Sequence, residues 1–218
     1  MQNNTKSDRN NLLKGYNMLL YFAGSMIMYE PTEECVTDFF SDGIMKKMPV
    51  RSSNPRFMQA VAVLRENCTD NELCRKSLIS DYNRLFSSDG PMLAIPRKSA
   101  YPIYANSGSN GDVNEFYNSY GWRSISRAKV PDDHLGLELL FLTKLIDKYI
   151  QLDDEPCRSE MKKEIYRFIG EHIITWIPEW NSKMQENADS VYYRGIANLV
   201  HASIEDLYLI FEDQSKPL

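Results

Sequence analysis

The 218 residues are 43% hydrophobic and 25% charged, which is an ordinary globular composition with enough apolar material for a substantial core. Twenty-five Lys and Arg against thirty Asp and Glu give a formal net charge of -5, and no basic block could neutralise a row of phosphates, which argues against nucleic acid as a partner. The polar N-terminus lacks a secretory signal pattern, and no apolar run approaches the roughly 18 residues that span a bilayer. We therefore expect a cytoplasmic protein without stable membrane insertion.

Hydrophobic periodicity is helical through most of the first 86 residues. It predicts helices over residues 12–28, 31–45, 57–66 and 69–86. Pro31 suits the first turn of the second of these helices, and Thr69 with Glu72 forms a capping box for the fourth.

The helical pattern then stops in "SSDGPMLAIPRKSAYPIYANSGSNG", residues 87–111. Three prolines and three glycines exclude a continuous helix here. Loops of this length inside a compact domain are usually functional or disordered. Because the first part keeps several apolar side chains, we expect it to pack against the helices, and only "ANSGSNG" to be loose.

The second half is helical as well. The pattern predicts helices over residues 112–120, from Pro131 to about 150, over 159–177, and over 189–213. No β-alternation of any length and no internal repeat is present, so the predicted class is all-α, a helical bundle. We expect a single domain over residues 1–218, in which an N-terminal lobe of about 1–110 and a C-terminal lobe of about 112–218 meet at a hinge of about 87–112.

The stretch "KVPDDHLGLELLFLTKLIDKYI", residues 129–150, places three ionisable groups before a leucine-rich run. Pro131 suits the first helical position, and Asp132 and Asp133 would then lie in the first turn, where negative charge meets the positive end of the helix dipole. Of the two, Asp132 is the expected cap. A protonated His134 would oppose the dipole, so its imidazole should be neutral and able to exchange hydrogen bonds.

A metal- or nucleotide-dependent enzyme using Asp133, His134 and Glu138 is the alternative reading of this stretch. His134 and Glu138 are four residues apart and share a helix face, but a metal needs further ligands. The other histidines, His172 and His201, lie in apolar helical patterns that suit packed residues. No GxSxG, Walker loop or GxGxxG is present. We expect no metal, no cofactor and no catalysis.

The four cysteines show no CxxC pair and no histidine at zinc-finger spacing. Reduced, partly buried thiols are therefore expected at all four positions, which are Cys35, Cys68, Cys74 and Cys157.

Four segments in order resemble the TorD and DmsD family of cytoplasmic redox enzyme maturation chaperones, which is more distantly related to NarJ. They are "DYNRLF" at 81–86, "DGPMLAIPRKSAY" at 89–101, "PDDHLGLELLFL" at 131–142 and the weaker "FIGEHIITWIPEW" at 168–180. Each segment alone is weak, but their order and spacing agree over about residues 75–182.

The resemblance implies an all-helical protein that binds the twin-arginine signal peptide of a partner molybdoenzyme's catalytic subunit, and sometimes its body, until the molybdopterin cofactor is loaded. The positions that match the family's motif residues are Leu85, Phe86, Pro96, Asp133 and His134. The carboxylate of Asp132 and the aromatic rings of Tyr82 and Tyr101 complete the expected peptide-binding site, because an arginine pair followed by an apolar segment needs carboxylates beside an apolar groove.

One departure concerns Arg97 and Lys98, which stand where relatives usually have Trp and Glu. Two cations there would repel an arginine pair, so either they point away from the peptide or this part of the site has changed. The departure leaves open a chaperone of a redox enzyme subunit that is not exported. We expect a monomer, with a domain-swapped dimer as the alternative because of the glycine-rich hinge.

Overall fold

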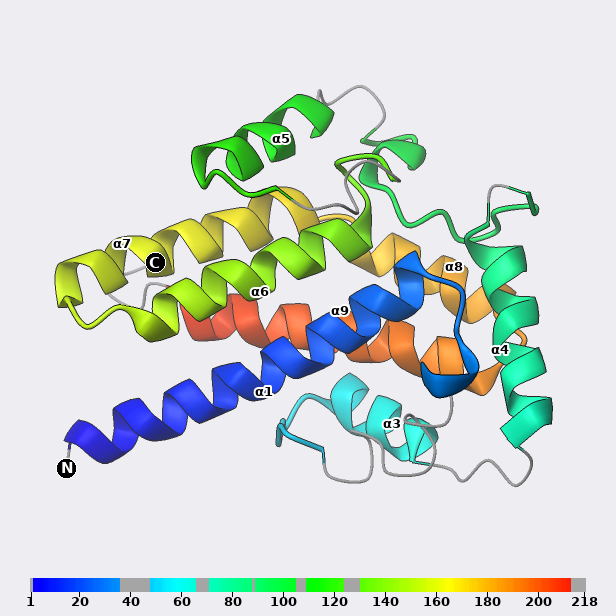
Figure 1. Cartoon of the computed structure of the whole chain (residues 1–218), viewed down its shortest axis with the longest axis horizontal. Helices are drawn as coiled ribbons and strands as arrows, with labels where there is room; N and C mark the ends of the chain where they lie inside the picture. The colour runs from blue at the N-terminus through cyan, green and yellow to red at the C-terminus, as the bar shows by residue number, and fades with distance from the viewer. Residues whose placement is uncertain are drawn as a thin grey trace.

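The computed structural model describes residues 2–35, 48–65, 71–87, 89–104, 109–123 and 130–212. These residues form helices joined by irregular links, and none of them belongs to a β-strand (Figure 1). The predicted all-α class is therefore confirmed. Within the same ranges, every helix is too short or too polar to cross a bilayer.

Four long helices lie lengthwise in the molecule: α1 (Gln2–Met28), α6 (Leu135–Gln151), α7 (Glu155–Phe168) and α9 (Val191–Phe211) (Figure 1). α1 packs along α6, and α6 packs on α7. The crossing of α1 and α6 is close because two glycines meet there. A Cβ atom on Gly136 would lie 3.0 Å from the carbonyl oxygen of Gly24 and would collide with the side chain of Met28.

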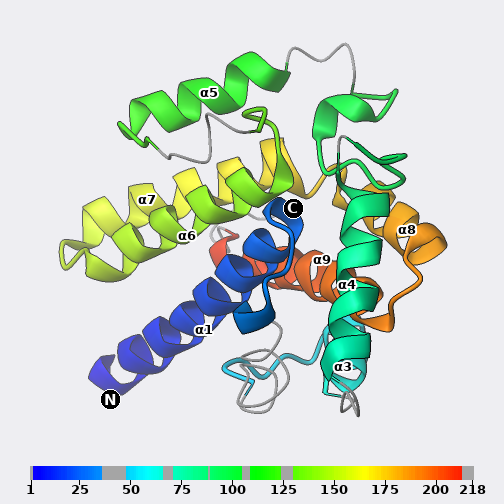
Figure 2. The same ribbon diagram turned by 45° about the vertical axis from the view of Figure 1, so that its right-hand side comes forward.

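The other helices surround these four. α3 (Pro55–Leu64) and α8 (Ile177–Asn187) pack on α9, while α4 (Asn71–Leu85) crosses one end of the molecule and α5 (Ser109–Ser119) lies at its edge (Figure 2). A 3₁₀ turn, η1 (Lys98–Ala100), lies between α4 and α5, and the π-helical segment η3 (Ile169–Ile173) continues α7. The side chains of Asn54, Asp154 and Ser190 accept backbone hydrogen bonds and so cap the starts of α3, α7 and α9.

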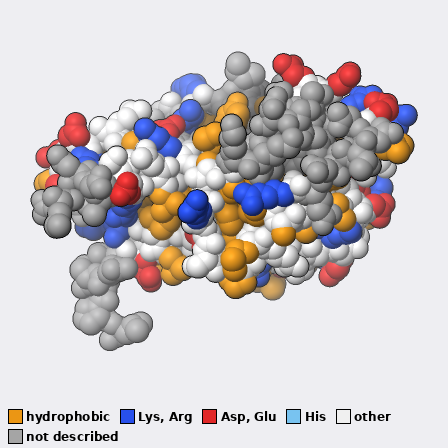
Figure 3. Space-filling model, turned by 90° about the horizontal axis from the view of Figure 1, so that it is seen from below, with side chains coloured by type: hydrophobic (Ala, Val, Ile, Leu, Met, Phe, Trp, Pro, Cys, Tyr) orange, Lys and Arg blue, Asp and Glu red, His pale blue; other side chains and the backbone are white. Residues whose placement is uncertain are grey.

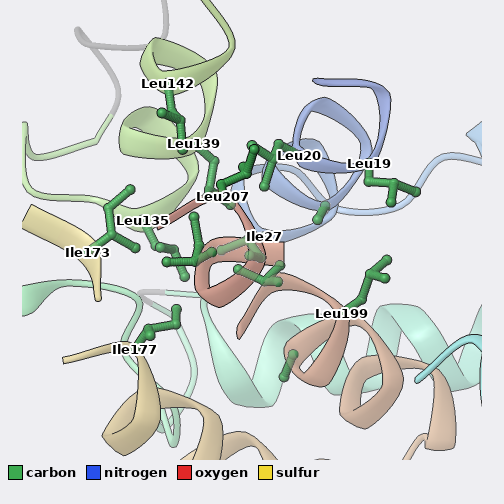
Figure 4. Packing of buried hydrophobic residues seen from close by; sticks show 14 of the residues in the cluster. Leu19, Leu20, Ile27, Leu135, Leu139, Leu142, Ile173, Ile177, Leu199 and Leu207 are labelled. Atoms are coloured by element: carbon green, nitrogen blue, oxygen red, sulfur yellow. The ribbon is translucent and has the colours of Figure 1, made fainter. Parts of the chain in front are cut away.

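The core lies where α1, α6 and α9 converge with η3 and α8 (Figure 4). Leu135, Leu139 and Leu142 of α6 are all fully buried in it, together with Leu207 of α9 and Ile173. The leucine-rich face of α6 is therefore core.

Several element bounds differ from the predictions. α6 begins at Leu135 rather than Pro131, and α8, which begins at Ile177 with Pro178 in its first turn, was not predicted. α1 begins at Gln2, earlier than predicted. α5 begins at Ser109, so the last residues of the stretch 105–111, which was expected to be loose, are helical. Most of the predicted 31–45 helix, the capping-box residue Thr69, and residues 105–108 lie outside the described ranges. The division into two lobes stays a prediction.

The cysteines differ from expectation at two positions. Cys35 is a reduced, half-buried thiol as expected, but Cys157 is reduced and exposed rather than partly buried. Cys74 is disulfide-bonded, so the expectation of a reduced thiol is wrong there. Cys68 lies outside the described ranges.

Candidate functional site

The start of α6 is set by a long-range backbone contact. The N–H of Leu135 donates to the carbonyl of Pro96 at 2.8 Å, and Arg97 and His134 form an isolated antiparallel bridge. This pairing holds His134 in an extended conformation, with φ -78° and ψ 125°, so the helix cannot begin before Leu135. The link between α4 and α5 thus passes the first turn of α6 (Figure 2).

The cap of α6 is His134. Its Nδ1 atom accepts a hydrogen bond of 3.1 Å from the N–H of Gly136. The expectations that Pro131 opens the helix, that Asp132 and Asp133 lie in its first turn, and that Asp132 caps it are wrong. The physical reason is the pairing with Pro96 and Arg97, which competes successfully with a local helix start.

The two aspartates have separate surroundings. Asp133 is 1% exposed, and its Oδ2 accepts a hydrogen bond of 3.0 Å from the N–H of Ser99. Asp132 is half-buried, and its backbone carbonyl accepts a hydrogen bond from the hydroxyl of Tyr117 at 3.0 Å. Asp133 is thus tied directly to residues 96–99, which we call the covering segment.

Burial controls the protonation of His134. Desolvation lowers its pKa to about 4, the negative charge of Asp133 opposes that shift, and the positive charge of Arg97 adds to it. The imidazole is neutral at pH 7, as expected, but mainly because it is buried rather than because of the helix dipole. A neutral ring is also what the cap requires, since Nδ1 must accept a hydrogen bond.

Glu138 lies one turn after His134 and is the least compensated acid of this region. It is 1% exposed, and neither carboxyl oxygen has a hydrogen-bond partner among the described residues. Burial raises its pKa well above the ordinary range, the charge of Asp133 raises it further, and Lys98 opposes both effects. The sequence suggested a role for this residue only in a metal- or nucleotide-dependent enzyme. Its carboxyl group is instead buried, in surroundings that favour the protonated form.

The two cations of the covering segment have different surroundings. The ammonium group of Lys98 donates to the carbonyl of Glu171 at 2.6 Å and lies 5.8 Å from the ring centre of Tyr104. Arg97 is half-buried, and its Nε atom has no hydrogen-bond partner in the described ranges. Lys98 is therefore turned toward η3, whereas Arg97 stays near His134.

A second group of candidate residues lies at the end of α4. The ring of Phe86 packs 5.7 Å from that of Tyr82 and 5.5 Å from that of Tyr193, and the Tyr82 hydroxyl donates to the carbonyl of Met28 at 3.0 Å. Leu85 is fully buried, and its carbonyl accepts from the N–H of Ala94 at 3.2 Å, which ties this group to the chain that leads into Pro96.

Tyr101 follows the covering segment. Its hydroxyl donates to the carbonyl of Ile95 at 3.1 Å, and its ring lies 5.7 Å from that of Trp176. The structure thus joins Pro96, Asp133 and His134 directly, and connects them to Leu85 and Tyr101 through the same loop.

The candidate site is closed in this structure. Asp133, His134, Pro96, Leu85, Phe86 and Tyr101 are buried, and Tyr82 and Asp132 are half-buried. The larger described cleft, of about 780 Å³, lies between the start of α3 and the C-terminal half of α9, and a second, of about 590 Å³, lies beside α3. Neither is lined by any candidate residue. A peptide could reach Asp133 only after the covering segment moves.

On the face shown in Figure 3, hydrophobic side chains form separate groups among lysines and arginines. Across the described part of the chain, no three His, Cys, Asp or Glu side chains converge in a way that could hold a metal ion.

Comparison with known proteins assigns the class. The family model described as nitrate reductase delta subunit matches residues 53–182. Three similar proteins are each named chaperone protein TorD. The one from Photobacterium profundum is 24% identical over 203 residues, covering 89% of this chain and 94% of that protein. The one from Aliivibrio salmonicida is 21% identical over 193 residues, covering 86% and 90%. The one from Vibrio parahaemolyticus is 25% identical over 150 residues, covering 66% and 69%.

The all-helical fold of the described residues and these matches define a maturation chaperone rather than an enzyme. The chain belongs to the nitrate reductase delta subunit family, which includes the TorD-type redox enzyme maturation chaperones. The resemblance drawn from the four sequence segments is thereby confirmed.

Proposed function

We propose that this protein is a cytoplasmic assembly chaperone for a molybdopterin-containing oxidoreductase. It binds the twin-arginine signal peptide of the catalytic subunit, and in addition its body, and holds the subunit until the cofactor is inserted and export can begin. It acts as a monomer and needs no cofactor of its own.

One observation carries the proposal. Two family segments that are more than thirty residues apart meet at the start of α6, where Ser99 donates to Asp133 and Pro96 accepts from Leu135. The contact places the buried carboxylate of Asp133 and the carboxyl group of Glu138 beneath a short covering segment, with the aromatic group of α4 one loop away. Carboxylates pair well with guanidinium groups, and an aromatic group suits the apolar residues of a signal peptide.

The test is a binding measurement with the twin-arginine signal peptide of a molybdoenzyme. We expect the natural peptide to bind at least ten-fold more tightly than a peptide in which both arginines are lysines, because lysine cannot form the bidentate contact. Asp133→Asn should weaken binding of the arginine peptide and remove most of this difference. Equal affinities of the wild-type protein for the two peptides would refute a twin-arginine reader.

A second candidate function is supported by the closure of the site and by Arg97, which stays beside His134. In this version the protein binds the body of a redox enzyme subunit that is not exported. Capture of the native client with and without its signal peptide separates the two functions. Loss of capture without the signal peptide supports the peptide reader, and undiminished capture supports the second function.

A further inference from the structure

Glu138 is buried without compensation, and the chain shows that this is not a general property of its buried acids. Asp81 is also 1% exposed, but it accepts hydrogen bonds from the N–H groups of Ser190 at 2.5 Å and Asp189 at 3.1 Å, and it pairs with Arg84. Glu138 has no such partners among the described residues. Because buried carboxyl groups are normally hydrogen-bonded, an orphan beside a candidate site points to a missing ligand.

The charges around Glu138 indicate which ligand it lacks. Asp133 and Lys98 are the charged groups with a Coulombic effect on Glu138, and Arg97 has such an effect on the neighbouring His134. Both cations belong to the covering segment, so a movement of that segment would take positive charge away from the two acids. A ligand that replaces the segment must restore this charge, which favours a cation over a neutral or anionic group.

We propose that Glu138 is a further recognition residue of the site, and that it receives a guanidinium of the client's arginine pair when the covering segment moves off the start of α6. The inference rests on the proposed function. Asp133 and Glu138 then supply one carboxylate for each arginine of the pair. The client's two cations take the place of Arg97 and Lys98, and each of the two acids gains one positive partner.

Two hydrogen bonds hold the covering segment over the start of α6. One runs from Leu135 to Pro96 and belongs to the bridge between Arg97 and His134, and the other runs from Ser99 to Asp133. Both involve backbone groups of the segment, so an extended peptide could form equivalent bonds in its place. The carboxyl group of Glu138 would lose its proton on pairing with a guanidinium, because the opposite charge favours the ionised form.

The experiment compares the wild-type chain with Glu138→Gln and with the control Glu171→Gln. Glu171 lies near Lys98 but carries an exposed carboxylate. Calorimetry measures binding of the natural signal peptide and of the same peptide with both arginines replaced by glutamine. We expect the wild type and Glu171→Gln to keep the full preference for the arginine peptide, and Glu138→Gln to lose about ten-fold of it, which corresponds to about 1.4 kcal/mol.

The outcomes are distinguishable. If the wild type shows no preference for arginine, the proposed function fails. If the wild type shows it and Glu138→Gln keeps all of it, the proposed function stands and the role of Glu138 is refuted.

A second measurement follows the proton, and its first part uses the wild type alone. Titrations of the wild type in two buffers with different ionisation enthalpies should show proton release on binding. Asp133, His134, Arg97 and Lys98 are unchanged in Glu138→Gln, so a smaller release in that variant would assign the proton to Glu138. The absence of any proton release from the wild type would contradict the proposal.

Discussion

Replacing His134 separates its structural role from any role in binding. His134→Ala removes the cap of α6 and a side chain that is 7% exposed, whereas His134→Asn keeps a side-chain acceptor for the N–H of Gly136. Loss of the cap costs about 1 kcal/mol, and the cavity left by the ring adds about 1–2 kcal/mol. For a chain of this size, a total of about 2–3 kcal/mol lowers the melting temperature by roughly 4–12 °C. His134→Asn should recover about 1 kcal/mol of this loss.

The same residue makes a pH prediction. The pKa of His134 is about 4 in the folded protein and 6.5 ordinarily, so the unfolded chain binds more protons between these values. Its contribution to stability is therefore complete above pH 6.5 and decreases as the pH falls toward 4. A pKa difference of this size corresponds to about 3 kcal/mol in the free energy of unfolding. His134→Asn should lack this part of the acid sensitivity.

Urea unfolding of the three proteins at pH 7 and pH 4.5, followed by circular dichroism, measures both effects. Equal losses of unfolding free energy in His134→Ala and His134→Asn would show that the cap of α6 contributes nothing to stability. An acid sensitivity of His134→Asn equal to that of the wild type would show that the imidazole is not buried in the neutral form.

Three further predictions concern stability. Gly136→Val should weaken the contact of α1 with α6, because a Cβ atom at this position collides with the side chain of Met28. The free energy of unfolding should fall by about 1–3 kcal/mol or more, which thermal melting measures. Asp81→Ala should cost about 3 kcal/mol in urea unfolding, since it leaves the buried N–H of Ser190 without its acceptor, and a change below 1 kcal/mol would contradict the structure. Glu138→Gln should raise stability at pH 7, because burial raises the pKa of this acid in the folded protein and so makes its ionised form costly there. The gain should shrink as the pH falls toward 4.5, and a loss that does not depend on pH would contradict the raised pKa.

The helical class and most helices could be predicted because hydrophobic periodicity records which face of each helix is buried. The exceptions involve proline. Pro178 was interpreted as the end of a helix, but it lies in the first turn of α8, and a three-residue link, 174–176, separates that helix from η3. Proline is compatible with the first turn of a helix as well as with the residues after its end, so the local pattern could not decide between them.

Pro131 gives the complementary case. Its position before two aspartates satisfies the local rules for a helix start, yet α6 begins four residues later because Pro96 and Arg97 pair with Leu135 and His134. A contact between residues that far apart in sequence leaves no periodic signal. For the same reason, the sequence suggested Asp133 and His134 as candidate site residues but could not show that residues 96–99 pair with them, or that Glu138 lies buried one turn later.

The closed site has an energetic consequence for a chaperone that must release its client. If binding requires the covering segment to move, the peptide must first replace two hydrogen bonds, and each contributes about 1 kcal/mol net. A cost of about 2 kcal/mol lowers the apparent affinity by a factor of about 30 relative to a permanently open site. The same cost favours selectivity, because only a ligand that compensates both Asp133 and Glu138 can offset it. A peptide with one cation would leave a buried acid unpaired, whereas an arginine pair would not. The closed form would thus exclude most peptides, and the covering segment, by returning over α6, would favour release of the correct one.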